Sequence, residues 1–462
     1  MTGADVSSRV AERPLEGLRV IDAGTRIGAP FCAGLLGEWG AEVIKVEQPG
    51  RGDFMREIGP FVSAGNGSGG AAGNGSGGAA GNGSGGAAGN GSGGYSLFWA
   101  VEGRGRKSAT ADLRRPEGQA LFRRLAEQSD VVCENFRPGT MESWSIGPAD
   151  LPSHLVYVRI SAFGQDGPYA SRPGLDRLGI AYGGLMHLTG EADRPPVRPG
   201  VTVADYLTGV FAAEATLAAL YLRDASKAAS GASPGDPPHL QDRAQGSAAS
   251  GERGSGRGAV IDASLYGSVL RILEWTIAAH DKLGTVRGRE GNRLANSAPL
   301  DNYPSADGRY VCIVAGSDAN FARLCKAMNR PDLAADDRFS SLAERARHGD
   351  VINAIVAGWA AEHSASEIEA ACIENDVPVA TAYSAADIMS DPHMRARGDI
   401  VTVEDPVAGP LRQQAPYPRL SGSMPQAPEG APLLGEHNTE VWCDLVGLTR
   451  EELSDLKRKG IV

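Results

Sequence analysis

Several features that would assign a function directly are missing from this sequence. Its six cysteines are scattered and form no C-x-x-C or zinc-finger spacing, which argues against a metal site and against a disulfide scaffold. No uninterrupted apolar run is long enough to cross a bilayer, and the first residues lack the apolar core of a signal peptide. We therefore expect a soluble, cytoplasmic protein with reduced cysteines and no bound metal.

Charge and motifs exclude further classes. The formal net charge of -11 argues against general binding to nucleic acid or to an anionic membrane, so an anionic ligand would need a local basic patch. The eight histidines include no H-x-x-x-H or H-E-x-x-H pair. The first strand-to-helix loop, GTRIGAP, is not the G-x-G-x-x-G fingerprint of dinucleotide-binding proteins.

Two segments have the composition of flexible insertions. Residues 65–94 repeat GNGSGGAA, which has nothing to bury and predicts a flexible coil, whether it is a natural expansion or an engineered linker. Residues 225–257 are small, polar and rich in Pro and Gly, which predicts a disordered surface insertion. Neither segment is expected to carry catalysis.

The remaining chain alternates between short apolar runs and helical patterns. LRVIDAG (18–24) and AEVIKVE (41–47) read as buried strands on either side of a helix at 29–40, which is a βαβ unit. The pattern repeats through a helix at 116–128 and strands at 130–134 and 155–161. An α/β fold with an open parallel sheet is therefore expected over residues 1–224. A strand and long helix begin at 259 and serve as a connection over 258–284, and a smaller α+β domain is expected over 285–400.

Two groups of residues are candidates for chemistry. Basic side chains gather in GRGRKS (103–108) and DLRRPEG (112–118), where they suit phosphate oxygens or form a solvated surface run. Asp176 in RPGLDRLG and Asp205 in VADYLTG lie in Gly- and Pro-framed surroundings. Helical spacing after Asp205 places it at a helix start, where an aspartate is usually an ordinary N-cap.

The order of several segments gives a more specific indication. PLEGLRVIDAG, GAEVIKVEQPGRGD, DVVCENFRPG, LVYVRISAFGQDGPY, PPVRPGVTVADYLTG, GRGAVIDASLYGSVL and APLLGEHNTEV resemble, in the same order, the class III CoA-transferases. The resemblance covers nearly the whole chain apart from the N-terminal tail and the two insertions. It implies a Rossmann-like large domain completed by a returning C-terminal segment (401–462), a small domain, and two chains interlinked as a homodimer.

The resemblance also implies a mechanism. Asp205 matches the family's catalytic aspartate in its D-x-x-x-G stretch, whose carboxylate attacks an acyl-CoA thioester and forms a mixed anhydride. CoA then moves to a carboxylic acid acceptor, so CoA is part of the substrate and no permanently bound cofactor is implied. A helix N-terminus would be expected to keep this carboxylate ionised. Asp176 matches an acidic position that binds substrate or handles protons.

At the positions where the family contacts CoA, some residues of this sequence match the family and others differ. Arg106, Lys107 and Arg114 fall on its basic elements, and Asn135 and Phe136 match its E-N-F-x-P-G loop. Ile27 stands where Gln is frequent, and Ser143 stands where Arg is frequent. These departures weaken any assignment of oxalate or formyl specificity.

Three alternatives remain open. The family includes α-methylacyl-CoA racemases, which pair the same aspartate with a His immediately before the position of Asp176; here that residue is Leu175, which cannot accept a proton. A nucleotide-dependent oxidoreductase fits the βαβ start but not the missing glycine fingerprint. A non-catalytic acyl-CoA-binding protein would use Asp205 only as a cap. The donor acid and the acceptor acid are not determined by the sequence.

Overall fold

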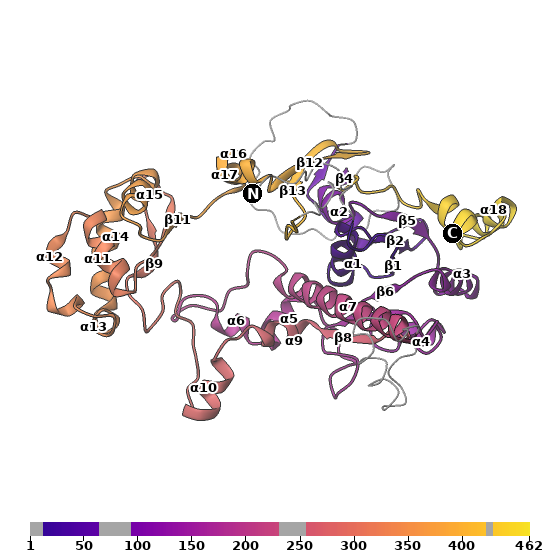
Figure 1. The fold of residues 1–462 in the computed structure, drawn as a ribbon, viewed down its shortest axis with the longest axis horizontal. Helices are drawn as coiled ribbons and strands as arrows, with labels where there is room; N and C mark the ends of the chain where they lie inside the picture. Colours follow the sequence, from indigo (N-terminus) through magenta and orange to yellow (C-terminus); the bar gives the residue numbers. More distant parts are fainter. Residues whose placement is uncertain (1–12, 64–93, 231–255, 422–427) are drawn as a thin grey trace, which may run out of the picture. The chain divides into compact units, whose positions relative to one another are not determined.

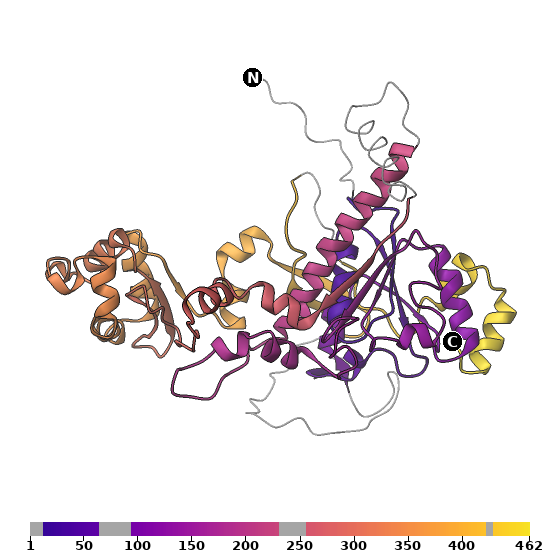
Figure 2. The ribbon, with the colours of Figure 1, turned by 90° about the horizontal axis from the view of Figure 1, so that it is seen from below.

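The computed structural model describes residues 13–63, 94–230, 256–421 and 428–462. These residues form two compact units (Figures 1 and 2). The first unit contains the described residues up to Gly183, together with Val201–Ile272 and Gly398–Val462, and the second contains Gly184–Gly200 and Leu273–Arg397.

A six-stranded parallel sheet organises the first unit. Its strands are β1 (Arg19–Asp22), β2 (Glu42–Glu47), β5 (Lys107–Thr110), β6 (Val131–Glu134), β7 (Val156–Ser161) and β8 (Val260–Ser264), in the spatial order β5-β2-β1-β6-β7-β8. Counted along the chain, this is the order 3-2-1-4-5-6 of doubly wound sheets. The predicted α/β fold with an open parallel sheet is confirmed.

Helices cover this sheet. In the first unit they are α1 (Gly28–Glu38), α2 (Leu97–Glu102), α3 (Pro116–Glu127), α4 (Thr140–Ser143), α5 (Asp176–Tyr182), α7 (Val203–Ser230), α9 (Leu265–Arg271) and α18 (Arg450–Arg458), with single turns at η1 (Phe54–Glu57) and η3 (Glu440–Leu445). Two antiparallel pairs, β3 (Phe61–Val62) with β4 (Tyr95–Ser96) and β12 (Ile400–Asp405) with β13 (Gly409–Gln414), complete the unit.

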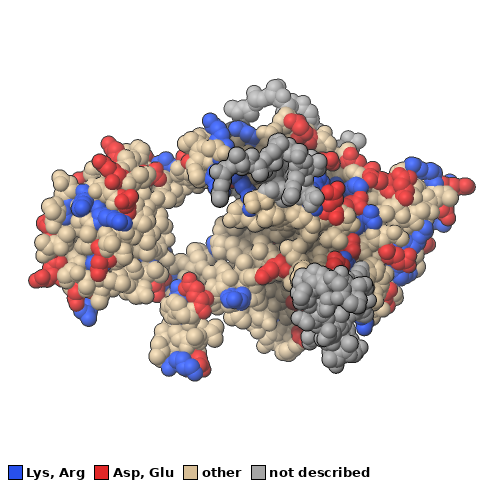
Figure 3. Space-filling model, in the orientation of Figure 1, with Lys and Arg blue, Asp and Glu red and all other residues tan. Residues whose placement is uncertain are grey.

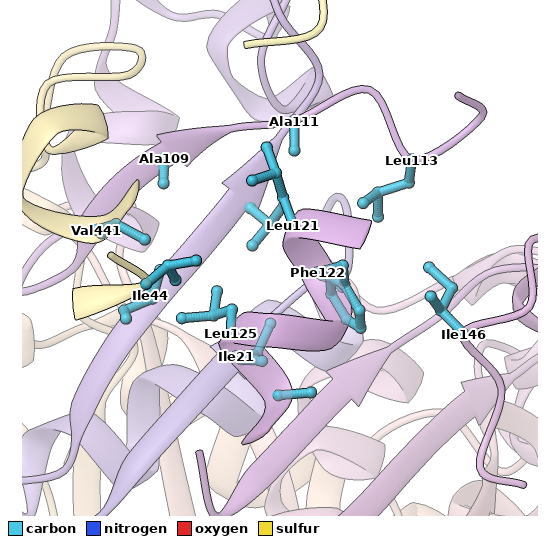
Figure 4. Close-up of a cluster of buried hydrophobic side chains, with 14 of the residues drawn as sticks. Ile21, Ile44, Ala109, Ala111, Leu113, Leu121, Phe122, Leu125, Ile146 and Val441 are labelled. Atoms are coloured by element: carbon cyan, nitrogen blue, oxygen red, sulfur yellow. The ribbon is translucent and has the colours of Figure 1, made fainter. Parts of the chain in front are cut away.

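The core beneath α3 shows why the predicted strands and helix form. β1 and β2 are buried almost throughout, as parallel strands covered on both faces must be, and they bury charged residues beside their Val and Ile side chains. α3 begins with Pro116, which needs no backbone donor in the first turn, and buries Leu121, Phe122 and Leu125 against the sheet (Figure 4). The returning C-terminal segment packs on the same core, where Trp442 Nε1 donates a hydrogen bond to the Thr110 carbonyl.

The second unit is a smaller α+β arrangement. Its antiparallel strands β9 (Leu300–Pro304), β10 (Tyr310–Val314) and β11 (Val379–Thr381) have the order β11-β10-β9. Its helices are α6 (Leu185–Leu188), α10 (Thr276–Leu283), α11 (Asp318–Ala327), α12 (Pro331–Ala334), α13 (Leu342–Arg347), α14 (Gly349–Ala361), α15 (Ala365–Glu374), α16 (Ala385–Ser390) and α17 (Pro392–Arg397), with a turn at η2 (Asp337–Phe339). Apolar side chains from α11, α14 and α15 bury one face of the three strands.

The division of the chain differs from the expected boundaries. Residues 184–200, assigned from sequence to the large domain, lie in the second unit. The reason is a set of hydrogen bonds in which Gly291 N donates to the Gly190 carbonyl and Arg289 donates to the carbonyls of His187 and Glu191. The long helix expected after residue 264 is in fact two helices, α9 and α10, because Glu274 adopts a left-handed conformation (φ 52°) between them.

The structure describes only a small part of the two predicted insertions. The repeat at 65–94 and most of 225–257 lie outside the described residues. Helix α7, however, continues to Ser230, so the start of the second segment is helical rather than irregular.

Helix α7 is the central helix of the first unit. It packs against α1, α5, α9, β7 and β8 (Figure 1). Its stretch Val203–Ser226 is, among the described residues, the one helix long and apolar enough to cross a membrane, a test that the core helix of a soluble protein also passes. The contact with α1 is close at Gly209, where an added Cβ would lie 2.9 Å from Phe31 Cδ1 and 3.1 Å from the Gly28 carbonyl oxygen.

The glycine of the D-x-x-x-G stretch thus sets the distance between α7 and α1, which leads to a testable expectation. Gly209→Val should push the helices apart and lower the melting temperature by several degrees, because overpacking costs roughly 1–3 kcal/mol. Differential scanning calorimetry measures this directly. The matched control is Gly358→Val, because Gly358 lies on the exposed side of helix α14 and no atom is near an added Cβ. Equal melting temperatures for the two variants would contradict the expectation.

Candidate active site

Two loops meet where the strand order of the sheet reverses. One loop (23–27) follows β1 and the other (135–139) follows β6, and β1 and β6 are neighbours in the sheet. Ligands of open α/β sheets bind in the crevice at such a point. Asn135 joins the two loops, because its Oδ1 accepts a hydrogen bond from Thr25 N (2.8 Å) and its Nδ2 donates to the Thr25 carbonyl (2.7 Å).

A buried ionic cluster supports the first loop from below. The Lys45 ammonium lies 2.9 Å from Asp53 Oδ2 and 3.3 Å from Asp22 Oδ2, and it donates a hydrogen bond to the Gly24 carbonyl (2.7 Å). Arg106 Nη1 lies 2.9 Å from Asp22 Oδ2. These side chains are almost completely buried, so their charges must compensate one another.

Lys45 and Asp53 favour their charged forms, whereas burial raises the pKa of Asp22 against the opposing effect of Lys45 and Arg106. Burial alone would lower the pKa of Lys45, but the two carboxylates beside it raise that pKa instead. Burial likewise opposes ionisation of Asp53, yet Lys45 and two backbone N–H donors lower its pKa below the ordinary value. Asp53 is therefore an ionised carboxylate available to the loop above it.

Asp53 fixes an unusual conformation at Arg26. Its Oδ1 accepts hydrogen bonds from the Arg26 backbone N–H (3.1 Å) and from Thr25 Oγ1 (3.3 Å). Arg26 has φ 64°, a left-handed conformation that disfavours residues with a Cβ. Its guanidinium carbon lies 4.0 Å from the centre of the Phe54 ring, a cation–π contact.

Asp205 lies in the first turn of α7, above the start of α1. A Cβ added at Gly28, the first residue of α1, would be 3.6 Å from Asp205 Oδ1. The side chain is half-buried, and its carboxylate makes no hydrogen bond or ion pair with any residue that the structure describes. Asp205 therefore has the helix-start position expected from the sequence but does not act as a cap.

Asp176 supplies the cap instead. Its Oδ1 accepts hydrogen bonds from the backbone N–H groups of Ala204 (2.8 Å) and Asp205 (3.2 Å) at the start of α7. A carboxylate at a helix N-terminus satisfies donors that have no partner within the helix. The structure thus brings Asp176 and Asp205 together, with Asp176 holding the backbone that carries Asp205.

This arrangement reverses the expected electrostatics of Asp205. The sequence predicted that the helix N-terminus would keep the carboxylate fully ionised, and this is wrong: burial and, secondarily, the charge of Asp176 raise the pKa of Asp205 to about 7. Arg26 acts in the opposite direction and lowers it. Two of the first-turn N–H groups already face Asp176, which weakens the favourable effect of the helix end.

The basic residues predicted to contact CoA are engaged within the chain. Arg106 lies beneath the loop and pairs with Asp22. Lys107 pairs with Glu42 and Glu440 at the edge of the sheet. Both line a cavity of about 700 Å³ beside α1, and each brings to its wall a charge that an internal ion pair balances.

Two other predicted CoA contacts, Arg114 and Phe136, and the departure at Ile27 lie in different environments. Arg114 is exposed and pairs with Asp112, two residues before it (2.8 Å). The Phe136 ring packs edge-to-face on Trp144, with ring centres 5.2 Å apart. The departing residue Ile27 belongs to a small buried apolar cluster, which explains why a polar side chain is not needed there.

Arg26, Lys45 and Asp53 are the site residues that sequence reasoning missed. Lys45 and Asp53 lie in GAEVIKVEQPGRGD, a segment that resembles the family, and Arg26 lies in the loop GTRIGAP, but neither stretch indicates that their side chains meet. On the face shown in Figure 3, basic and acidic side chains are interspersed over the described surface. Among the described residues, no group of three or more His, Cys, Asp or Glu side chains is arranged to hold a metal.

Comparison with known proteins identifies the family of this fold and site. The model of CoA-transferase family III matches residues 15–231 and 245–438. A succinyl-CoA–D-citramalate CoA-transferase of Chloroflexus aurantiacus is 37% identical over 460 residues, covering 99% of this chain and 100% of that protein. A succinyl-CoA:mesaconate CoA-transferase of Haloarcula hispanica is 32% identical, covering 92% of this chain and 95% of the other.

A solved structure agrees with these relatives. The crystal structure of a CAIB/BAIF family protein from Brucella suis superimposes with a TM-score of 0.71 at 28% identity, covering 94% of this chain and 99% of that chain. The resemblance noted in the sequence is confirmed over nearly the whole length. The chain belongs to the class III CoA-transferases, and it is an enzyme that transfers CoA between an acyl thioester and a carboxylic acid.

Proposed function

We propose that Asp205 is the covalent nucleophile of this CoA transfer. The observation that carries the proposal is its half-buried carboxylate, which has no hydrogen bond or ion pair within the described residues and lies at the ligand crevice of the sheet. A carboxylate is a weak nucleophile when it is solvated or paired, so this environment favours attack. The raised pKa adds nucleophilicity while leaving an ionised fraction near neutral pH.

The transfer then has four balanced steps. An Asp205 oxygen attacks the thioester carbonyl carbon and the C–S bond breaks. This step forms an acyl-aspartyl anhydride and releases CoA as the thiolate. The thiolate attacks the aspartyl carbonyl, which gives an aspartyl-CoA thioester and releases the donor acid. The acceptor carboxylate attacks the aspartyl carbonyl of that thioester, the C–S bond breaks, and a second anhydride forms with release of the CoA thiolate. The thiolate finally attacks the acceptor's acyl carbon, which forms the new thioester and restores Asp205.

Neighbouring groups position and stabilise these steps. The exchange begins and ends with one thioester and one carboxylate, so it needs positioning more than a strong acid or base. α1 begins beside Asp205 Oδ1, and the backbone N–H groups of its first two residues, Gly28 and Ala29, have no acceptor within the helix. We assign them to the developing oxyanion. Asp176 acts as a positioning residue by holding Ala204 and Asp205 in place.

We further propose that the substrates are dicarboxylic. The named relatives use succinyl-CoA as donor, with D-citramalate or mesaconate in the name of the second substrate. Succinyl-CoA is accordingly the first donor to test here, with a four- or five-carbon dicarboxylic acid as acceptor. A racemase reading has less support, because Leu175, immediately before Asp176, offers no proton-accepting group.

The enzyme is proposed to act as a homodimer. Exposed apolar side chains lie on α5, α7 and α9, three helices that pack together in the first unit (Figure 1). They include Leu178, Val210, Tyr221 and Leu270. Apolar surface of this kind marks an interface. A second copy of the chain, interlinked with the first as the family resemblance implies, is the proposed occupant.

Covalent catalysis can be tested by trapping. Incubation with succinyl-CoA and hydroxylamine should convert Asp205 to its hydroxamate, located by peptide mass spectrometry. Asp205→Asn should lose the adduct and reduce kcat by at least about a thousandfold, because the covalent route is removed. Asp193→Asn, at an exposed position, is the control. Full turnover by Asp205→Asn with the same substrates would show that another group is the nucleophile.

The raised pKa of Asp205 makes a linked prediction for pH. In the free enzyme kcat/KM should fall as pH drops below about 7, because the carboxylate becomes protonated. For stability the sign is opposite: the folded state binds this proton more tightly than the unfolded state, whose carboxyl has a pKa of about 4. The free energy of unfolding should therefore decrease as pH rises from about 4 through 7.

Asp205→Asn isolates this stability effect. It should melt at a higher temperature than the wild type at pH 8, and the difference should shrink as pH falls toward 4, as followed by circular dichroism. Asp193→Asn should show no such pH-dependent difference. An Asp205→Asn melting temperature below that of the wild type at pH 8 would mean that the ionised carboxylate has a stabilising partner.

Assembly can be measured by light scattering after size-exclusion chromatography. The wild type should have twice the mass of one chain. Leu217→Asp combined with Tyr221→Asp, on the exposed face of α7, should shift the protein to the monomer because two charges would be buried in the interface. Ile373→Asp, exposed on α15, should remain dimeric. A monomeric wild type at micromolar concentration would contradict the proposal.

A further inference from the structure

We propose that Arg26 binds the free carboxylate of a dicarboxylic acyl group while the other carboxyl carbon reacts at Asp205. This inference rests on the proposed function of Asp205 and assigns to one residue the preference for dicarboxylic substrates. Four observations support it: a strained backbone, a guanidinium without an anionic partner, an aromatic platform beneath it, and its location beside the proposed nucleophile.

The backbone of Arg26 is held in place from several sides. Its φ of 64° is unfavourable for a residue with a Cβ and persists only where surrounding contacts enforce it. Asp53 accepts the Arg26 N–H, and Asn135 accepts and donates hydrogen bonds at the adjacent Thr25. A glycine would adopt this conformation without strain, so a long cationic side chain here needs a reason.

The Arg26 guanidinium differs from its basic neighbours. Lys45 and Arg106 are ion-paired inside the buried cluster, and Arg104 pairs with Glu38 (2.7 Å). Arg26 is half-buried, and its guanidinium makes no ion pair or hydrogen bond with any described residue. It stacks on Phe54 instead, which leaves its N–H groups available at the ring's rim. A partly desolvated guanidinium without an anion favours binding one.

The position of Arg26 relative to Asp205 indicates which anion. Arg26 lies two residues before Gly28, over which Asp205 Oδ1 is placed, and its charge lowers the pKa of Asp205. The two side chains nevertheless form no ion pair, so the cation and the carboxylate are held apart. A short dicarboxylic acyl group also holds a free carboxylate apart from its reacting carbonyl. In the proposal its free carboxylate pairs with the Arg26 guanidinium while its carbonyl carbon meets an Asp205 oxygen.

The consequence is discrimination between donors of similar size. A succinyl group would satisfy the guanidinium through a bidentate, charge-assisted contact. A butyryl group has the same number of carbons but no second carboxylate, so it would leave the guanidinium desolvated and unpaired. Sites built to pair with a polar group reject analogues that lack it more strongly than apolar pockets distinguish sizes.

The donor half-reaction tests this without an acceptor acid. Hydroxylamine inactivation of the enzyme is followed at increasing concentrations of succinyl-CoA or butyryl-CoA, which gives a rate constant and a half-saturation concentration for each donor. Arg26→Gly removes the side chain and relieves the strained φ, so folding should be preserved. Its efficiency with succinyl-CoA should fall about 10- to 100-fold, the range of a charged hydrogen bond, and its efficiency with butyryl-CoA should stay within about threefold.

Two further variants complete the experiment. Arg26→Lys keeps the charge but not the planar fork and should give an intermediate preference for succinyl-CoA. Asp376→Gly is the matched control, because Asp376 is an exposed residue of the second unit with a similar positive φ (53°). It should leave both donors unaffected.

The outcomes separate this inference from the function it rests on. Equal losses with both donors in Arg26→Gly, or a wild type that prefers butyryl-CoA, would overturn the role of Arg26 while leaving Asp205 as nucleophile. A wild type that transfers CoA without hydroxylamine sensitivity would overturn the Asp205 mechanism, and the ratio of kcat/KM for the two donors would then decide on Arg26. A wild type active only with other acyl-CoA donors would overturn the dicarboxylic assignment and the role of Arg26 together.

Discussion

The ammonium group of Lys45, placed between Asp22 and Asp53, is the interaction on which the site depends. Lys45 extends from β2, Asp22 ends β1, and Asp53 leads into η1, so one cation joins three segments at the carboxyl edge of the sheet. Two buried carboxylates without this cation would repel each other and lose their solvation. Because Lys45 also binds the Gly24 carbonyl, the loop after β1 is fixed by the same group.

The two acidic residues of the site do different work because their surroundings differ. The Asp176 carboxylate accepts hydrogen bonds from two backbone N–H groups, whereas the Asp205 carboxylate accepts no hydrogen bond from any described residue. Burial raises the pKa of Asp205 and the charge of the nearby Asp176 raises it further, so the fixed charge of one makes the other more basic. The same neighbour stabilises the α7 backbone and destabilises the ionised carboxylate of Asp205, which is a common trade-off at functional sites.

Local patterns predicted the parts of the fold that depend on neighbouring residues. The apolar runs of β1 and β2, the start of α3 at Pro116 and the helix-start position of Asp205 are all local features, and the structure has them. The division of the chain was less predictable, because residues 184–200 join the second unit through hydrogen bonds to a segment about a hundred positions away. The spacing of apolar residues along the sequence does not indicate a contact between residues so far apart.

The candidate site shows the same limit. Asp205 and Asp176 were named from the sequence, but the cap formed between them requires two helix starts to meet. The raised pKa of Asp205 follows from its burial in the fold and, secondarily, from the charge of Asp176. Arg106 illustrates the converse. It was expected at a phosphate because it lies in a basic run, yet in the fold its side chain turns inward to Asp22. A run of basic letters does not distinguish a residue that binds a ligand from one that balances a buried charge.

Asp176 and Arg26 act in opposite directions on the pKa of Asp205, and this affects the proposed reaction. With the site empty, Arg26 offsets part of the repulsion from Asp176 and holds down the pKa of Asp205. A dicarboxylic acyl group that pairs with Arg26 neutralises this cation and leaves Asp205 facing Asp176 alone. The pKa of Asp205 then rises further, so the ionised carboxylate is more nucleophilic while a smaller fraction of it is ionised at neutral pH. A monocarboxylic thioester leaves Arg26 unneutralised, so it lacks the binding contact that the dicarboxylic acyl group makes.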